Sequence, residues 1–281
     1  MPRDKVTRFA PSPTGPLHLG HAYSALISAE RAGAGRFVLR IEDIDRTRCR
    51  PEWEAQILDD LHWLGLRWET PVMRQSDRMP AYRAALDHLV AEGLLYPCRC
   101  TRADIRAALS APQEGAPPHG PDGLIYPGTC RARSMADAGP QDALRLNLRA
   151  ALGRTGALFF TENGPLHTGE HAIDPNWMAA QVGDVVLARR DMGTSYHLSV
   201  VVDDAAQGIT EVTRGVDLFE ATVIHVLLQA LLKLSQPTYW HHDLIRDEQG
   251  KRLAKRDDAR AIALYRAQGA TPQDIRAMIG L

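Results

Sequence analysis

The stretch "RFAPSPTGPLHLGHAYSALI" (residues 8–27) contains the end of an apolar segment, a proline-rich turn and the beginning of a helix. Residues 6–10 predict a short strand that ends at Pro11. Apolar side chains then recur at helical spacing, at Leu19, Ala22, Tyr23, Leu26 and Ile27. "RFVLRIED" (residues 36–43) predicts a second strand. A strand, a helix and a strand in close succession predict a βαβ unit with a parallel sheet.

The turn before this helix has the character of a phosphate site. Backbone N–H groups at the positive end of a helix favour a phosphate. His18 and His21 would add donors for charge that develops on the phosphate during displacement. Gly20 would let a nucleotide approach closely. By itself the turn is also compatible with two ordinary surface histidines.

The composition is that of an ordinary globular protein of one to two domains. Of 281 residues, 44% are hydrophobic and 24% charged, and the formal net charge is −1, so any basic surface must be local. The chain has no apolar run long enough to cross a bilayer, and its first residues lack the core of a signal peptide. We expect a cytoplasmic protein.

The rest of the chain alternates between regular and irregular segments. Residues 53–64 and 82–90 predict helices, and residues 97–140 are rich in proline and glycine. Strands are predicted at residues 184–189, 197–204 and 208–215, followed by an apolar helix over residues 223–234. The order predicts a first βα half, an irregular insertion and a second half.

Several motifs together resemble the class I aminoacyl-tRNA synthetases. His18-Leu19-Gly20-His21 resembles their "HIGH" signature, and its surroundings resemble the glutamyl/glutaminyl branch. Residues 39–48 and 195–218 resemble that branch's second catalytic strand and its substrate-binding strand, loop and strand. The resemblance covers about residues 5–257 and implies an α/β, Rossmann-like nucleotide-binding domain with a parallel sheet.

"KRLAKRD" (residues 251–257) resembles the second signature, "KMSKS". By this resemblance the ATP-binding residues are His18, Gly20, His21, Arg252, Leu253, Ala254, Lys255 and Arg256. Arg252 replaces the usual lysine and Ala254 the usual hydroxyl residue, while the phosphate-binding Lys255 is retained. The resemblance makes His18, His21 and Lys255 the catalytic residues, acting on ATP with Mg²⁺.

The resemblance also implies a pocket for a small acidic substrate. Its residues are Arg8, Phe9, Ala10, Pro11, Ser12, Glu42, Tyr196 and Arg214. Glu42 would hold the α-amino group, whereas Arg8 and Arg214 would clamp a side-chain carboxylate, which guanidinium groups bind well. L-Glutamate is therefore favoured over glutamine. Residues at strand ends are well placed to bind ligands in α/β sheets.

Cys98, Cys100 and Cys130 suit a tetrahedral, structural zinc in a segment with few apolar residues. A disulfide is the alternative, which a cytoplasmic setting disfavours. From the residues alone, the fourth ligand could be Tyr126, His119 or water. Glutamyl-Q tRNA(Asp) synthetases carry a Cys-x-Cys…Tyr-x-x-x-Cys zinc site, and this resemblance favours Tyr126.

Only 24 residues follow Asp257, enough for one or two short helices, so we expect no anticodon-binding domain. We predict halves of the catalytic domain at residues 1–97 and 181–245, a zinc-containing α+β insertion at 98–180 that resembles an acceptor-binding domain, and a signature loop with a helical tail at 246–281.

The zinc pattern and the short tail resemble the glutamyl-Q tRNA(Asp) synthetases, a family that activates glutamate with ATP and transfers it to queuosine at the wobble position of tRNA(Asp). We expect a monomer with this activity. Three alternatives remain: a truncated synthetase that charges tRNA(Glu), another nucleotidyltransferase that makes a small-molecule adenylate, and a non-catalytic relative that binds tRNA or a protein.

Overall fold

A computed structural model describes residues 4–110, 119–245 and 261–281. Its N-terminal part contains β1 (Val6–Phe9), α1 (Leu19–Ala32) and β2 (Arg36–Ile41), with β1 and β2 parallel. After α2 (Pro51–Trp63), β3 (Glu69–Arg74) adds a further parallel strand beside β2. The predicted βαβ unit and parallel sheet are confirmed.

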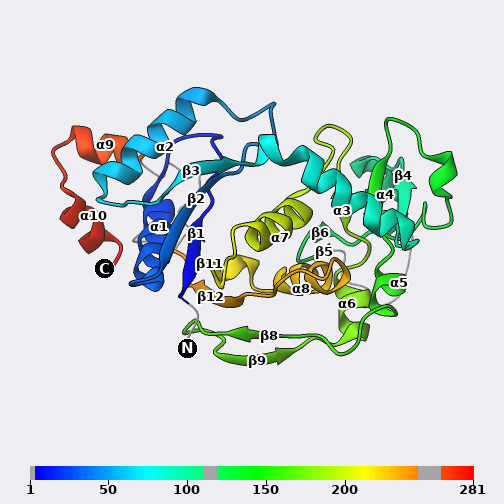
Figure 1. The fold of residues 1–281 in the computed structure, drawn as a ribbon. Helices are drawn as coiled ribbons and strands as arrows, with labels where there is room; N and C mark the ends of the chain where they lie inside the picture. Colours follow the sequence, from blue (N-terminus) through cyan, green and yellow to red (C-terminus); the bar gives the residue numbers. More distant parts are fainter. Residues whose placement is uncertain (1–3, 111–118, 246–260) are drawn as a thin grey trace.

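The second half extends this layer on the other side of β1. Strand β11 (Glu211–Gly215) pairs in parallel with β12 (Thr238–His242), and α8 (Thr222–Leu231) connects them. β11 lies beside β1, where the Thr210 N–H donates to the Val6 carbonyl over 2.9 Å. The spatial order is therefore β3, β2, β1, β11, β12 (Figure 1), the order of a Rossmann-like sheet. Ligands bind such sheets at the crevice where the strand order reverses, here between β1 and β11.

One predicted element is wrong in kind. Residues 197–204 were expected to form a strand but belong to helix α7 (Tyr196–Ala206), which Ser195 caps by accepting from the Leu198 N–H. Most of α7 is buried, and its buried residues include His197, Ser199, Asp203 and Asp204 as well as apolar side chains, so the sequence shows no clear helical period. A short apolar run with three successive valines therefore reads equally well as a buried strand.

The insertion begins after α3 (Met79–Ala91) and is built on an antiparallel sheet of β4 (Leu95–Cys98), β7 (Ala143–Leu146) and β10 (Val186–Ala188). Its further elements are α4 (Arg102–Ser110), β5 (His119–Gly120), β6 (Gly123–Leu124), α5 (Leu148–Leu152) and α6 (Pro175–Gln181). The hairpin of β8 (Phe159–Glu162) and β9 (Gly169–Ala172) joins the edge of β12. Hydrogen-bonded strands thus cross the expected boundary at residue 180, and the domain limits remain a prediction.

The tail consists of α9 (Ile262–Ala267) and α10 (Pro272–Met278), the short helices expected there. Figure 1 shows both on the side of α1 and α2. Ile262 and Ile275 are fully buried in a cluster with apolar residues of α1 and β2. Within the described ranges, no helix combines the length and apolar character needed to span a membrane.

Candidate active site and metal site

Two histidines shape the start of α1. His18 is the N-cap residue, and its Nδ1 accepts from the Gly20 N–H over 3.1 Å. The His21 Nδ1 accepts from the His18 N–H over 3.2 Å, which completes a capping box. Since each Nδ1 is an acceptor, each neutral ring carries its proton on Nε2. The ring centroids lie 3.8 Å apart, so both rings present a donor at the positive end of one helix.

Gly20 has a steric role that the sequence did not reveal. A Cβ at this position would lie 3.1 Å from Cε1 and 3.2 Å from Nδ1 of His18. These contacts are tighter than most real Cβ contacts, so a side chain would displace the imidazole. The absence of a side chain at Gly20 therefore leaves the His18 imidazole in place and leaves space for a ligand.

Ile245 and Ala261, which flank residues 246–260, both lie beside His18. Ile245 lines the cavity beside His18, while Ala261 forms an antiparallel bridge with His18 and the Ile262 N–H donates to the Leu17 carbonyl over 2.9 Å. The predicted residues Arg252, Leu253, Ala254, Lys255 and Arg256 lie outside the described residues. Their role remains a prediction.

A cavity of about 410 Å³ gathers most of the predicted site. It opens between β1, the start of α1 and the end of β11, at the strand-order reversal. The predicted residues that line it are Arg8, Phe9, Ala10, His18, Gly20, His21, Glu42, Tyr196 and Arg214. Ser12 lines a neighbouring cavity instead, and Pro11 lines neither.

A buried charge network forms the wall of this cavity at β1 and β2. Arg8 donates from Nε to Asp204 Oδ1 over 3.1 Å and from Nη1 to the Thr213 carbonyl over 3.0 Å. Arg40 donates to the same Asp204 oxygen over 2.7 Å and lies 3.4 Å from Glu42. Burial raises the pKa of Glu42, although Arg40 and Arg8 oppose the effect. Two arginines and two carboxylates thus balance one another in a nearly dry site.

Arg214 occupies the opposite wall in a different environment. Its guanidinium donates to His241 Nε2 over 3.0 Å, to His225 Nδ1 over 2.9 Å and to Thr222 Oγ1 over 2.7 Å. Tyr196, the first residue of α7, lines the same cavity, and burial raises the pKa of its hydroxyl. The two arginines predicted as a clamp therefore line one cavity, Arg8 paired with a carboxylate and Arg214 held by imidazoles.

The prediction missed several residues of this site. Asp204 and Arg40 were not expected, although each is a charged residue within an apolar run, which is a signal of a buried ion pair. His242 lines the cavity and shares a 2.8 Å hydrogen bond with Ser24 Oγ. Its position beside a strand end was visible in the sequence, but its partner on α1 was not.

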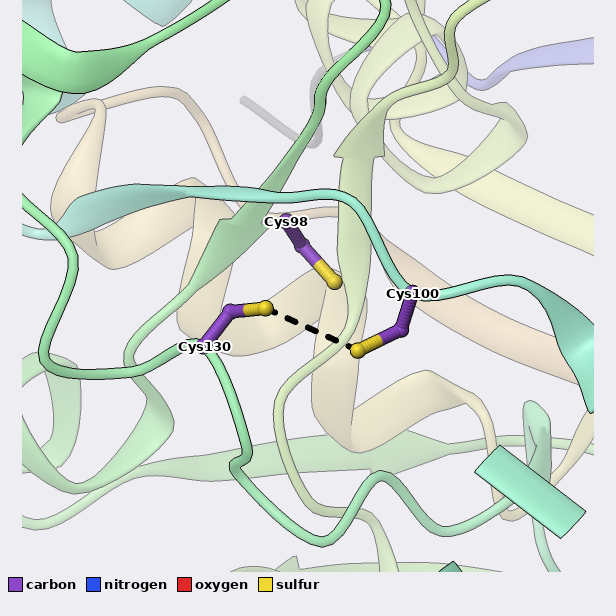
Figure 2. A group of neighbouring side chains, drawn as sticks. All are labelled: Cys98, Cys100 and Cys130. Carbon is purple, nitrogen blue, oxygen red and sulfur yellow. Dashed lines mark hydrogen bonds between the residues drawn. The ribbon is translucent and has the colours of Figure 1, made fainter. Parts of the chain in front are cut away.

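The three predicted cysteines also converge. Figure 2 shows Cys98, Cys100 and Cys130 pointing toward one another, with Sγ atoms all within 4.8 Å and those of Cys100 and Cys130 3.6 Å apart. The Tyr126 hydroxyl lies 3.4 Å from the Cys98 and Cys100 sulfurs and accepts from the Cys130 N–H over 2.8 Å. Among the described residues this cluster does not include His119, which lies on β5.

These separations fit a single tetrahedral ion. Zinc–sulfur bonds of about 2.3 Å and a zinc–oxygen bond of about 2.0 Å place two sulfurs about 3.8 Å apart and a sulfur about 3.5 Å from the oxygen. The observed 3.6 Å and 3.4 Å agree with this geometry. Three thiolates suit zinc, and the phenol oxygen is an uncommon fourth ligand that lies at a compatible distance.

The pKa values of two cysteines in the cluster are shifted in opposite directions. Burial raises the pKa of Cys100 to about 11, whereas hydrogen bonds that include the Tyr126 hydroxyl outweigh burial and lower the pKa of Cys130 to about 7. Arg145 donates from Nε to Cys98 Sγ over 3.3 Å, and its Cζ lies 3.9 Å from the centroid of the Tyr126 ring. A buried cation thus stands beside a site that becomes anionic when its thiols ionise.

A second cavity of about 770 Å³ adjoins the first and shares Glu42 and Tyr196 with it. It lies between the catalytic sheet and the insertion, because Ser12 lines it on one side and Cys100 on the other. Its arginines are Arg48, Arg102, Arg145, Arg189 and Arg190. The same cavity is lined by the carboxylates of Glu42, Asp45, Asp122 and Asp191, and Asp45 and Asp191 pair with Arg48 and Arg189.

Comparison with known proteins identifies related chains. The family described as tRNA synthetases class I (E and Q), catalytic domain, matches residues 5–281. A glutamyl-Q tRNA(Asp) synthetase from Rhodobacter capsulatus is 63% identical over 98% of this chain and 100% of its own length. One from Symbiobacterium thermophilum is 43% identical over 95% of this chain and 83% of its own length.

Solved structures agree with the observed fold. A glutamate tRNA ligase from Elizabethkingia meningosepticum, in complex with its amino acid, superposes with a TM-score of 0.69 at 26% identity. The match covers 91% of this chain and 53% of that one, so this chain spans about half the length of that ligase. A methionyl-tRNA synthetase from Mycobacterium tuberculosis, at 9% identity and a TM-score of 0.58, shares the fold alone.

Proposed function

We infer the function of this chain from its family, for it belongs to the class I tRNA synthetases of the glutamyl and glutaminyl type. We propose that it activates L-glutamate with ATP and transfers the glutamyl group to queuosine at the wobble position of tRNA(Asp). The acceptor is the one in the names of its relatives. The chain is thus a ligase with ATP, glutamate and tRNA as substrates.

One observation carries this proposal. The donors at the start of α1 and the two arginines Arg8 and Arg214 line the same cavity of about 410 Å³. A nucleotide phosphate and an acidic amino acid can therefore meet within one cavity that is open to solvent. Such a meeting is what the formation of an acyl-adenylate requires.

In the first step, an oxygen of the glutamate α-carboxylate attacks the α-phosphorus of ATP. The bond from that phosphorus to the β-phosphate oxygen breaks, pyrophosphate leaves and glutamyl-adenylate forms. The Nε2–H groups of His18 and His21 stabilise the charge that spreads over the phosphoryl oxygens. Lys255 is proposed to contribute a further positive charge there. Mg²⁺, bound with ATP, supplies charge neutralisation on the leaving pyrophosphate.

The walls of the cavity select the amino acid. Arg8 and Arg214 bind the side-chain carboxylate, Glu42 accepts from the α-ammonium group, and Tyr196 contributes a polar contact. Phe9, Ala10, Pro11 and Ser12 complete the segment from which Arg8 projects. Fixed guanidinium groups favour an acid over the corresponding amide.

In the second step, a hydroxyl of the queuosine cyclopentene ring attacks the activated carbonyl, AMP leaves and an ester forms. The second cavity, with its arginines beside Glu42 and Tyr196, is the proposed entrance for the tRNA. No side chain is assigned as a general base. An adenylate is reactive enough for positioning to suffice.

The zinc is structural in this proposal. The ion would be held by Cys98, Cys100, Tyr126 and Cys130. It would connect the end of β4 to the segment around residues 126–130 that precedes β7. Few apolar side chains gather in this region, so the ion would supply stability that packing does not. We expect the chain to act as a monomer in the cytoplasm.

The test is glutamate-dependent exchange of labelled pyrophosphate into ATP, measured with and without tRNA. The chain should support exchange with glutamate and much less with glutamine. His21→Ala should reduce exchange by about 100-fold or more, since it removes a transition-state donor. The matched control is His88→Ala, a histidine of α3 outside the cavity. Unchanged exchange in His21→Ala would remove this residue from catalysis, and no exchange by the unmodified chain would refute the activation step.

A further inference from the structure

Arg214 differs from the other buried arginines of the site in its partners. Arg8 and Arg40 share the carboxylate of Asp204. Arg214 is just as buried, with 6% of its surface exposed, yet its hydrogen bonds go to imidazole, hydroxyl and carbonyl acceptors. Over the described ranges, no carboxylate oxygen of the chain lies within 4.0 Å of its guanidinium.

The direction of the protons behind Arg214 follows from its chemistry. A guanidinium only donates, so His225 Nδ1 must accept and the His225 proton must be on Nε2. That proton is donated to His197 Nδ1 over 3.1 Å. His197 then carries its own proton on Nε2 and donates it to Asp122 Oδ1 over 3.0 Å. One chain of hydrogen bonds therefore orders two neutral rings behind the guanidinium.

A second imidazole works in the same way on the other side. His241 accepts from Arg214 Nε at Nε2 and donates from Nδ1 to Glu162 Oε2 over 2.5 Å. Burial lowers the pKa of His241 and, together with the adjacent Arg214, lowers the pKa of His225 well below its usual value. Both rings are therefore neutral at physiological pH, and neither adds a charge that would compensate or repel the guanidinium.

The position of these groups on α8 argues against incidental packing. Thr222 and His225 lie one helical turn apart on a mostly apolar helix and both contact Arg214. A third buried polar residue, Gln229, lies one turn further along and accepts from the Tyr239 hydroxyl over 3.3 Å. Burial of a neutral polar side chain is unfavourable unless the side chain is hydrogen-bonded. Thr222 and His225 both gain a hydrogen bond from the Arg214 guanidinium.

We propose that His225, oriented by His197, is a positioning residue for glutamate: it holds Arg214 in the cavity as a cation that no carboxylate of the described residues contacts directly, since Glu162 and Asp122 lie beyond the imidazoles. The inference rests on the proposed function and deepens it. Arg8 offers directed donors whose charge Asp204 already balances, whereas Arg214 supplies the net positive charge that distinguishes an acid from an amide. A carboxylate partner in place of the imidazoles would give Arg214 the same geometry without this selectivity.

The test compares the KM for glutamate and the KM for ATP in pyrophosphate exchange. His225→Leu removes the acceptor for Arg214 and should raise the KM for glutamate about 10-fold or more while the KM for ATP changes less than about twofold. His225→Asn keeps an acceptor near Nδ1 and should recover most of the loss. Gln229→Leu, equally buried on the same helix, is the control and should leave both values unchanged.

Asp122 supplies a second variant that does not disturb the core, because 42% of its side chain is exposed. Asp122→Asn should raise the KM for glutamate by about threefold through weaker orientation of His197. The inference is overturned if His225→Leu or Asp122→Asn leaves this KM unchanged, if His225→Asn is no better than His225→Leu, or if the KM values for ATP and glutamate rise together. Absence of exchange by the unmodified chain would instead refute the proposed function, and the inference with it.

Discussion

Asp204 offers the most direct test of how the proposed glutamate pocket is built. Its Oδ1 atom accepts from Arg8 and from Arg40, and all three side chains are almost fully buried. Asp204→Asn removes one negative charge and leaves Glu42 as the partner of Arg40. The surrounding network then carries a net positive charge in a site with little access to water.

The size of the effect follows from these contacts. Removing one partner of a buried ion pair destabilises a protein by about 3–5 kcal/mol, so the melting temperature should fall by roughly 5–15 °C. Asn keeps an amide oxygen that can accept from Arg8 Nε, so this hydrogen bond loses only its charge assistance, about 1–1.5 kcal/mol. Because Arg8 is then held less firmly, the KM for glutamate should rise about 5- to 10-fold.

The adjacent Asp203 is a matched control. It is fully buried and accepts from the Tyr82 hydroxyl over 2.6 Å and from Gln75 over 3.1 Å, but it does not contact Arg8. Asp203→Asn should lower the melting temperature comparably and leave the KM for glutamate unchanged. Thermal unfolding and pyrophosphate exchange measure the two effects separately. Equal KM values for both variants would refute the assignment of Arg8 to the glutamate pocket.

Asp204 also predicts an acid response of the fold. Burial would raise its pKa, but Arg8 and Arg40 outweigh burial and hold the pKa below the ordinary 3.8. The ionised form therefore stabilises the folded state at neutral pH, and this contribution is lost as the pH falls below 3.8.

Further predictions concern the metal site, the stability of the fold and the turn at residues 18–21. Cys98→Ser should abolish zinc binding measured by elemental analysis, and Tyr126→Phe should weaken it by about 10- to 100-fold; a chain that holds no zinc, or equal affinity in Tyr126→Phe, would contradict the site. Burial raises the pKa of Asp60 to about 6, so the ionised form destabilises the folded state at pH 7, and its stabilising protonated form is lost as the pH rises from 3.8 through 6. Asp60→Asn should therefore raise the melting temperature by about 1–3 °C at pH 7 and not below pH 4, a difference that calorimetry would detect. Gly20→Ala should lower exchange by about 10-fold at unchanged melting temperature, because the new Cβ crowds His18; wild-type exchange would show that the imidazole need not stay in place.

Local patterns predicted the elements whose periodicities are distinct. The strand, turn and helix at residues 6–32 follow from a proline-rich break between two different apolar periods. Helix α7 could not be assigned in this way, because burial on nearly every side removes the polar stripe that marks a helix. The cysteine cluster was predictable from spacing and chemistry, whereas Tyr126 was predicted beside it only by resemblance, and its hydroxyl does lie 3.4 Å from the Cys98 and Cys100 sulfurs.

The partners of the predicted site residues could not be predicted, because most of them lie far away in the sequence. Arg8 was expected in the pocket, but its partner Asp204 lies 196 residues later in the chain. Arg214 was expected as a clamp, yet no local pattern links it to His225 or His241, whose rings meet it only when β11, α8 and β12 pack together. The sequence predicts groups that would bind substrate, whereas the groups that orient them depend on the assembled fold.

Transfer of labelled glutamate tests the identity of the acceptor most directly. After confirmation of glutamate-dependent exchange, labelled glutamate should be offered with tRNA(Asp) that carries queuosine, with tRNA(Asp) that lacks it, and with tRNA(Glu). We predict stable labelling of the queuosine-bearing tRNA(Asp) alone. Equal labelling of tRNA(Asp) without queuosine, or labelling of tRNA(Glu) instead, would contradict it.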